Sequence, residues 1–303
     1  MKMKMMKTMK MKAAGLFLAV LLGATVFTGC GSSGNATDQK GFDYDNEITV
    51  ISREDGSGTR GAFVELSGVE QKNEAGEKID YTTLEATITN NTSVMMTSVA
   101  NDIYAIGYIS LGSMNDTVKA IAIDDVEISA EAVKNGSYQM SRPFHLATAG
   151  EVSEAAEDFL NYILSAEGQA VIEGEGYVAI DDSAEEFASN GAAGKVVIAG
   201  SSSVTPVMEK LKEAYGTVNA NVTIEIHTSD SSTGVASVTE GTCDFGMVSR
   251  ELKDSEKEAG VQEITIARDG IAVIVNNENP VDGLPMETVK DIYVGDILTW
   301  SEI

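Results

Sequence analysis

Short apolar stretches typical of buried strands alternate with longer stretches of helical spacing along most of the sequence. Glu47–Ser52 and Lys195–Ala199 are of the first kind. Val207, Leu211 and Tyr215, at four-residue intervals, mark a helix. This alternation favours an α/β fold with mainly parallel sheets. Further strands are expected at Ala105–Ser110, Val222–Ile226, Phe245–Val248 and Gly270–Val275, and further helices from Gly58 and over Met95–Ala100, Ser153–Leu164, Glu167–Glu173 and Met286–Tyr293.

The charge balance excludes several kinds of partner. The 303 residues hold 21 Lys and Arg against 47 Asp and Glu, for a formal net charge of −26. Nucleic-acid binding needs a basic face, so it is excluded, and attachment to anionic lipid through a polybasic patch is disfavoured. Taken alone, the acidity also argues against a small anion as ligand.

The N-terminal segment has the pattern of an export signal. Residues 1–29 contain five lysines and no acid, and include the apolar run Ala13–Phe27, which is too short to span a membrane. Thr28-Gly29-Cys30 then resembles a bacterial lipobox, although Phe27 stands where leucine is usual. We expect cleavage after residue 29, acylation of Cys30 on the extracytoplasmic face, and a flexible tether over residues 30–46. The alternative is a plain signal peptide with an incidental cysteine.

Cysteine and histidine are too scarce for most metal sites. The chain has Cys30 and Cys243, and its two histidines are His145 and His227. Acylation of Cys30 would leave no disulfide and no cysteine-based metal site. Cys243 lies in GTCDFGMVS just before an apolar strand and is expected to be a small buried apolar residue. Neither a metal nor a cofactor is predicted.

Three loops between a strand and a helix combine glycine with hydroxyl side chains. They are Ser52–Gly61 (SREDGSGTRG), Gly200–Pro206 (GSSSVTP) and Ser229–Gly234 (SDSSTG). Glycine lets the backbone approach a ligand, the helix start offers free N–H groups, and Arg53 presents a planar fork for two oxygens. This chemistry suits an oxyanion. The alternative for each loop is helix capping alone, and the absence of Walker and GxGxxG patterns disfavours nucleotides.

Five segments together resemble the PstS family of phosphate-binding proteins of ABC importers. They are GSSSVTPVMEKLKEAY, SSTGVASVTEGTCDFGMVSREL, DGIAVIVNNENPV, IYVGDILTWSEI and ITVISREDGSGTRGAF, of which SREDGSGTR is the most diagnostic. The resemblance covers most of residues 46–303. It implies a type II periplasmic-binding-protein fold, with two α/β lobes joined by hinge strands, inorganic phosphate in the cleft, and delivery to membrane permease subunits.

The resemblance also implies the site residues. Some family members carry an aspartate, aligned here with Ser249, that accepts a hydrogen bond from protonated phosphate. Asp55 or Asp230 could replace that acceptor. Arg250 is a possible additional ligand, although it and Arg60 could instead form ion pairs with Glu251 or another acid. The phosphate ligands implied by the family are Arg53, Ser57, Gly58 and Thr59 from one lobe, and Ser202, Ser203, Ser231 and Ser249 from the other.

The order of the segments differs from the family pattern. GSSSVTP normally opens the mature chain, whereas here it follows SREDGSGTR. Joining TWSEI to EITVISRE would restore the usual order, which predicts a circular permutation in which the linker at residues 181–194 bridges the usual termini. A misplaced gene boundary or a fragment of a tandem array is the alternative. We expect lobe one over residues 107–272, and lobe two over residues 41–106 and 273–303.

Other functions have less support in the sequence. Ser57 is not in a G-x-S-x-G nucleophile motif and few bases are present, so an enzyme is not expected. A lipoprotein of this fold that binds sulfate, tungstate or molybdate, or that serves as a surface sensor, is the alternative to a phosphate carrier. The protein is expected to be a monomer that contacts membrane lipid through acylated Cys30.

Overall fold

The computed structural model of the protein describes residues 41–303. The expected signal peptide (residues 1–29), acylated Cys30 and the first part of the tether lie outside the described residues. In the described part of the chain, no helix has both the length and the apolar character needed to cross a membrane.

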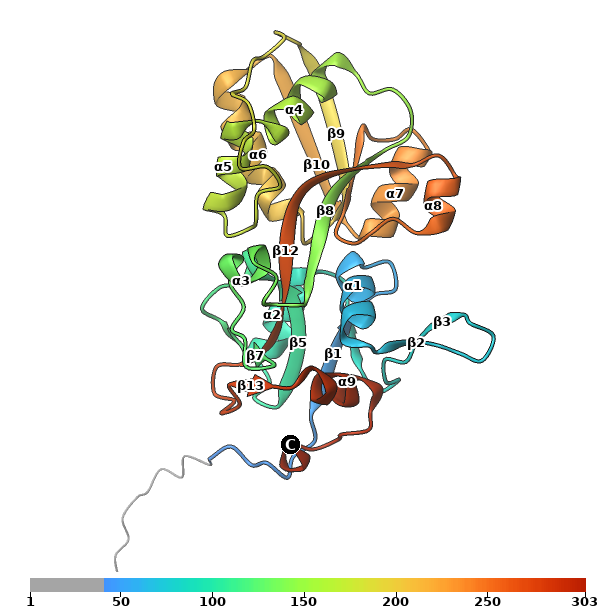
Figure 1. Ribbon diagram of the computed structural model, residues 1–303, viewed down its shortest axis with the longest axis vertical. Helices are drawn as coiled ribbons and strands as arrows, with labels where there is room; N and C mark the ends of the chain where they lie inside the picture. The colour runs from blue at the N-terminus through green and yellow to red at the C-terminus, as the bar shows by residue number, and fades with distance from the viewer. Residues whose placement is uncertain (1–40) are drawn as a thin grey trace, which may run out of the picture. The chain divides into compact units, whose positions relative to one another are not determined.

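Residues 41–303 form two lobes, each with its own sheet, helices and apolar core (Figure 1). Lobe two contains residues 41–140 and 270–303, and lobe one contains residues 141–269. The chain passes from lobe two to lobe one at the start of β8 (Ser141–Thr148) and returns within the long strand β12 (Gln262–Asn276). These two strands pair antiparallel and form the hinge.

Lobe two is built on a mixed sheet in which β1 lies between β4 and β5. The strand order is β4 (Thr87–Thr89), β1 (Thr49–Arg53), β5 (Ala105–Ser110) and the second half of β12, which also pairs with β6 (Val118–Ala120). Strand β1 is parallel to β4 and β5, whereas β12 is antiparallel to β5 and β6. The helices of this lobe are α1 (Gly58–Ser67), α2 (Thr92–Ala100), α3 (Ala130–Lys134) and α9 (Met286–Val294).

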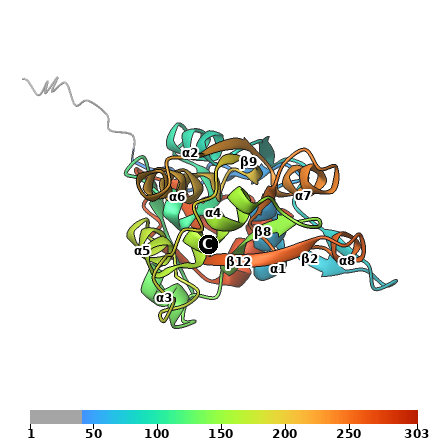
Figure 2. The ribbon, with the colours of Figure 1, turned by 90° about the horizontal axis from the view of Figure 1, so that it is seen from above.

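Lobe one has helices on both faces of its sheet (Figures 1 and 2). Its strand order is β10 (Val222–Ser229), β9 (Gly194–Ser201), β11 (Phe245–Val248), β8 and the first half of β12. One face packs against α4, α5 and α6 in a large core, and the other packs against α7 in a smaller core. The helices are α4 (Glu154–Leu164), α5 (Ala166–Gly174), α6 (Thr205–Val218), α7 (Ser231–Thr239) and α8 (Asp254–Glu258).

Several short elements complete the fold. Two pairs of short strands lie outside the main sheet, and two single turns of 3₁₀-helix flank longer elements. The elements are β2 (Glu70–Lys72) with β3 (Lys78–Asp80), β7 (Ala122–Ile123) with β13 (Gly283–Leu284), and the turns Leu111–Ser113 and Trp300–Glu302.

The sequence predicted the α/β class and most elements, but it missed much of the hinge. Strand β8 was not expected, because Pro143 interrupts its apolar pattern and proline cannot donate to a sheet. Only the second half of β12 was expected, since the first half ends at the charged pair Arg268 and Asp269. Asp269 is buried and pairs with Arg142 at 2.9 Å, which makes a charged residue tolerable inside a strand.

The lobe boundary expected at residue 107 is wrong. Strand β5 lies entirely in lobe two, where it pairs with both β1 and β12. Val118, Tyr138 and Met140 belong to the same apolar core as β1. Residues 107–140 therefore fold with lobe two, because their apolar side chains are buried there.

The linker and the end of the tether are both attached to the fold. Residues 184–193 contain neither helix nor strand, as expected of a linker, but Ser189 and the Asn190 N–H both donate to buried Asp158. Phe42 packs edge-on against Trp300, with ring centroids 5.9 Å apart. The tether prediction is therefore wrong from Phe42 onward, because an aromatic side chain that can be buried holds the segment against lobe two.

Candidate functional site

Five loops meet where the two lobes face each other, and each follows the carboxyl end of a strand. Lobe two contributes the loops before α1 and α2, and lobe one contributes the loops before α6 and α7 and the segment after β11. The four helices thus begin at the interface between the lobes. Free N–H groups and a partial positive charge at a helix start attract anions, so this arrangement suits an oxyanion.

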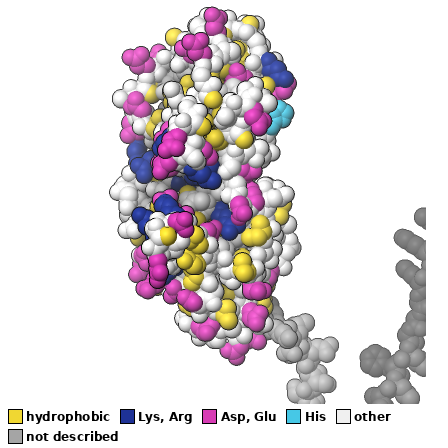
Figure 3. Space-filling view, turned by 90° about the vertical axis from the view of Figure 1, so that its right-hand side faces the viewer, with side chains coloured by type: hydrophobic (Ala, Val, Ile, Leu, Met, Phe, Trp, Pro, Cys, Tyr) yellow, Lys and Arg dark blue, Asp and Glu magenta, His cyan; other side chains and the backbone are white. Residues whose placement is uncertain are grey.

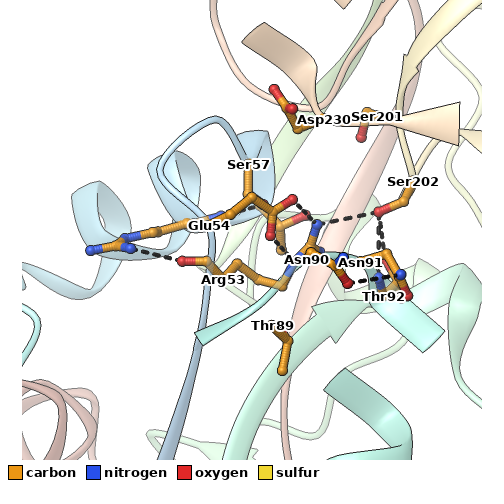
Figure 4. A network of polar contacts seen from close by, with 12 residues as sticks. Arg53, Glu54, Ser57, Thr89, Asn90, Asn91, Thr92, Ser201, Ser202 and Asp230 are labelled. Carbon is orange, nitrogen blue, oxygen red and sulfur yellow. Dashed lines mark hydrogen bonds and ion pairs between the residues drawn. The ribbon is translucent and has the colours of Figure 1, made fainter. Parts of the chain in front are cut away.

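Arg53 lies at the centre of this interface and is 2% exposed. Its Nε and Nη2 donate to the two carboxylate oxygens of Glu54 at 2.8 and 2.7 Å, and Nη2 also donates to Ser202 across the interface at 3.3 Å (Figure 4). The backbone N–H of Arg53 donates to the Tyr108 hydroxyl at 3.1 Å. Tyr108 stacks on Phe63, with centroids 4.0 Å apart, so the core of lobe two fixes the base of the arginine.

Burial of Tyr108 keeps its hydroxyl protonated. Burial raises the pKa of Tyr108 to about 12, although hydrogen bonds with Ser52 and the Arg53 backbone act in the opposite direction. The neutral phenol therefore accepts from the Arg53 N–H and bonds the Ser52 hydroxyl at 2.8 Å across the physiological range. The neutral Tyr108 side chain thus positions Arg53 without adding charge to the interface.

Hydroxyl groups bond directly across the interface beside Arg53. Thr59 of lobe two and Ser203 of lobe one lie 2.7 Å apart between their oxygens. The Thr92 hydroxyl is 3.2 Å from the Ser202 hydroxyl, and the Thr92 N–H donates to the same oxygen at 3.4 Å. A hydroxyl can turn its proton toward an oxyanion, so each of these groups is a potential donor.

A second group of hydroxyls lies on the lobe-one side. Ser201 donates to Ser249 at 2.9 Å, and the Ser249 N–H donates to the Ser231 hydroxyl at 3.1 Å. Gly58, the first residue of α1, approaches them closely: a Cβ on it would lie 2.6 Å from the Ser249 oxygen and in contact with that of Ser231. Glycine is therefore required at position 58 for the lobes to meet as they do.

Some of the expected site residues have structural partners of their own. Ser57 caps α1 by accepting from the Arg60 N–H, and Asp230 caps α7 by accepting from the Thr233 N–H and hydroxyl. The Asp55 side chain is 97% exposed and pairs with Arg60, so its carboxylate points away from the hydroxyls. These positions disfavour Asp55 as the acceptor for protonated phosphate.

Arg250 and Arg60 both form ion pairs with acidic side chains, which was the alternative to a role as phosphate ligands. Arg250 pairs with Glu256, donates to the backbone of Glu251, and reaches Ser232 at 3.2 Å. Arg60 pairs with Asp55 and with Asp80 at 2.8 Å, and donates to the Arg53 carbonyl. Their guanidinium groups therefore brace the loops around Arg53 and Ser249.

Sequence reasoning missed Thr92 and Ser201. Thr92 is the first residue of α2 and follows Asn90 and Asn91, which connect it to β4. This junction has the same strand-to-helix form as the three recognised loops but contains no glycine. Ser201 lies in the recognised GSSSVTP loop but was not among the expected ligands. A search for any hydroxyl at a strand-to-helix junction would have found both.

Positive side chains collect between the lobes despite the acidity of the protein. Lys and Arg gather at the waist in Figure 3, whereas Asp and Glu are spread over both lobes. A groove of about 520 Å³ opens beside the hydroxyls between Asn90–Ser93 of lobe two and Ser202 and Thr228 of lobe one. Arginines are thus concentrated at this waist, where Arg53, Arg60 and Arg250 are each paired with a carboxylate.

Comparison with known proteins assigns the fold and the family. The model described as a PBP superfamily domain matches residues 32–167 and 185–302. Phosphate-binding protein PstS 2 of Streptococcus agalactiae is 50% identical over 95% of this chain and 96% of its own length, and PstS 2 of Streptococcus pneumoniae is 40% identical over 97% and 100%.

A solved structure agrees with these matches. The crystal structure of a phosphate-binding protein of a phosphate ABC transporter from Streptococcus pneumoniae superposes with a TM-score of 0.67 and 42% identity, covering 85% of this chain and all of that one. The expected periplasmic-binding-protein fold is therefore confirmed. The chain belongs to the PBP superfamily and, within it, to the PstS family of phosphate-binding proteins of ABC importers.

Proposed function

We propose that the protein captures inorganic phosphate between its two lobes and delivers it to the permease of an ABC importer on the extracytoplasmic side of a membrane. The observation that carries the proposal is the buried guanidinium of Arg53 beside hydroxyls from both lobes. Four helix starts at the same interface add donors without adding charge. Membership of the PstS family supports phosphate as the oxyanion.

The proposed ligand set is large enough for useful affinity. A micromolar dissociation constant corresponds to about −8 kcal/mol. A hydrogen bond to a charged group contributes about 1.5–3 kcal/mol. Arg53, Gly58, Thr59, Ser202, Ser203, Ser231 and Ser249, joined by Thr92, therefore supply enough donors to reach that affinity after the cost of lobe closure.

Ser249 bears on the selectivity of the site. A serine hydroxyl both accepts and donates hydrogen bonds, so it can accept a hydrogen bond from the O–H of HPO₄²⁻ but can also donate one to sulfate. Asp230 has both carboxylate oxygens engaged by Thr233. We therefore expect weaker rejection of sulfate than an aspartate at position 249 would give.

Acylation of Cys30 and the permuted order of the segments are also part of the proposal. An acyl group on Cys30 would hold the protein near its permease. The permuted order is proposed to be native, which is supported by the match to streptococcal PstS 2 proteins over nearly their whole length in a single alignment. Asn46 and Ile48 bond the backbone of Trp300 and Leu298, so the two ends of residues 41–303 lie close together, as a permutation requires.

Titration calorimetry of the purified protein with phosphate tests the function. We expect one site per chain with micromolar or tighter affinity. Sulfate and molybdate are the matched competitors, and heat with either of them but none with phosphate would contradict the proposal. Trp300 fluorescence is a poor reporter, because the tryptophan is buried beside Phe42 in the core of lobe two. The C-terminal end of the chain, which carries it, lies at the end of lobe two away from lobe one (Figure 1).

A further inference from the structure

One cluster of ionisable side chains is not used by the proposed phosphate site. His145 lies on β8, Glu251 follows β11, and Glu263 lies on β12. One ligand atom from each lies within 4.8 Å of the others. The histidine Nε2 is 3.7 Å from a carboxylate oxygen of Glu251 and 3.9 Å from one of Glu263. Three elements of lobe one thus bring a nitrogen and two carboxylates together.

His145 is buried with one nitrogen unsatisfied. Its side chain is 3% exposed, and its Nδ1 lies 3.1 Å from the Thr265 hydroxyl. Its Nε2 has no hydrogen-bond partner among the described residues and faces the two carboxylates. A buried polar atom without a hydrogen-bond partner lowers the stability of the fold, so a ligand bound to this nitrogen would be favourable.

An ion pair does not account for this geometry. Both separations exceed hydrogen-bond length. Lys257 pairs with Glu263 at 3.0 Å through the other oxygen of that carboxylate, and the oxygen nearer His145 accepts from the Leu252 N–H at 3.2 Å.

The spacing fits a small divalent ion. Ligand atoms about 2.1 Å from one ion, at a tetrahedral angle, lie about 3.4 Å from each other. The two histidine-to-carboxylate separations of 3.7 and 3.9 Å need only a small contraction, and the two carboxylate oxygens lie within 4.8 Å of each other. The Glu251 side chain is 64% exposed, so it can move to shorten its distance to His145. The Thr265 hydroxyl would fix the ring by accepting from Nδ1–H, as outer partners of metal-bound histidines do.

We propose that His145, Glu251 and Glu263 bind one Zn²⁺ or a similar divalent transition-metal ion, with water completing the coordination. This departs from the expectation of no metal, which considered only sites rich in cysteine or histidine. Glu251 is two residues from Ser249, so a bound ion would tie the Ser249–Glu251 segment to the hinge strands β8 and β12. The site is complete in lobe one and does not depend on phosphate.

Zinc titration of the full chain tests this inference in phosphate-free buffer. Calorimetry is expected to give one Zn²⁺ per chain at micromolar or tighter affinity, with a higher melting temperature and no response to Mg²⁺. Glu251→Gln should weaken zinc binding at least tenfold, and because the side chain is exposed this variant should fold normally. His145→Gln should do the same, with the melting temperature of the metal-free protein as its folding check.

His227→Gln is the matched control. His227 is exposed and lies 3.9 Å from Glu225, so it reproduces a histidine–glutamate pair without the third ligand or the burial. The zinc affinity of His227→Gln should equal that of the wild type. Equal zinc affinity in wild type and Glu251→Gln, or loss of binding in His227→Gln, would overturn the assignment. Zinc binding without phosphate binding would leave this site standing and contradict only the proposed function.

Discussion

At the scale of single residues, hydrogen bonds hold the guanidinium and the backbone of Arg53 in one position. Arg53 is buried, and its position is set from below by Tyr108 and from the side by Glu54. Because Glu54 already neutralises the guanidinium, the pair adds little net charge to the interface. Affinity for an anion must then come from directed hydrogen bonds, which act in a dry interface more strongly than in water.

Arg53→Ala should weaken phosphate binding by at least tenfold, because a charge-assisted bond contributes about 1.5–3 kcal/mol. Titration calorimetry measures the effect. Arg268→Ala is the control, since Arg268 carries the same charge on β12 with an exposed side chain. Unchanged affinity in Arg53→Ala would remove this arginine from the site, and an equal loss in both variants would point to a general charge effect.

At the scale of elements, the site is made by helix starts. Each of α1, α2, α6 and α7 begins at the interface between the lobes, and each follows a strand of its own lobe. The sequence predicted three of these junctions from their glycine and hydroxyl residues. It missed the junction before α2, because Thr92 follows two asparagines, a pattern equally typical of a simple helix cap.

Gly58→Ala should lower phosphate affinity at least tenfold. The added methyl would meet the Ser231 and Ser249 hydroxyls and keep the lobes apart. Gly61→Ala, in the same helix, is the control, because its Cβ would lie an ordinary 3.4 Å from Arg250. Gly61→Ala gains up to about 1 kcal/mol of helix propensity and should not lower the melting temperature, which is also measured for Gly58→Ala as its folding check. Normal affinity in Gly58→Ala would show that α1 does not approach the ligand.

At the scale of the whole molecule, β8 and β12 carry the connection between the lobes. Arg142 on β8 pairs with Asp269 on β12, and also donates to the Ser249 carbonyl at 3.1 Å. Burial raises the pKa of Asp269, against the opposing effect of Arg142. A buried pair at the crossing point thus links the hinge to the segment that carries Ser249. Local sequence patterns could not reveal this pairing, since Arg142 and Asp269 are remote in the chain.

A chain reordered to the usual family arrangement should fold and bind phosphate with nearly the same affinity. It would start at Ala184, end at Ser183, and join Ile303 to Gly41 through a few glycines and serines, because the present ends lie close together. Thermal unfolding should show one transition that phosphate raises. Opening the chain instead between Asp269 and Gly270 should abolish binding, because it cuts a hinge strand. Failure of the first variant to fold would contradict the permutation.

The α/β class, the family and three of the loops at the interface could be predicted from the sequence, because they depend on local patterns of apolar, glycine and hydroxyl residues. The lobe boundary, the positions of Thr92 and Ser201 at the interface, and the grouping of His145 with Glu251 and Glu263 follow from the three-dimensional fold and could not be predicted from local patterns. Each of these depends on contacts between segments distant in sequence. The net charge of −26, taken alone, argued against a small anion, but the arginines at the waist act over short distances in a buried interface, where the charge of the whole molecule matters little.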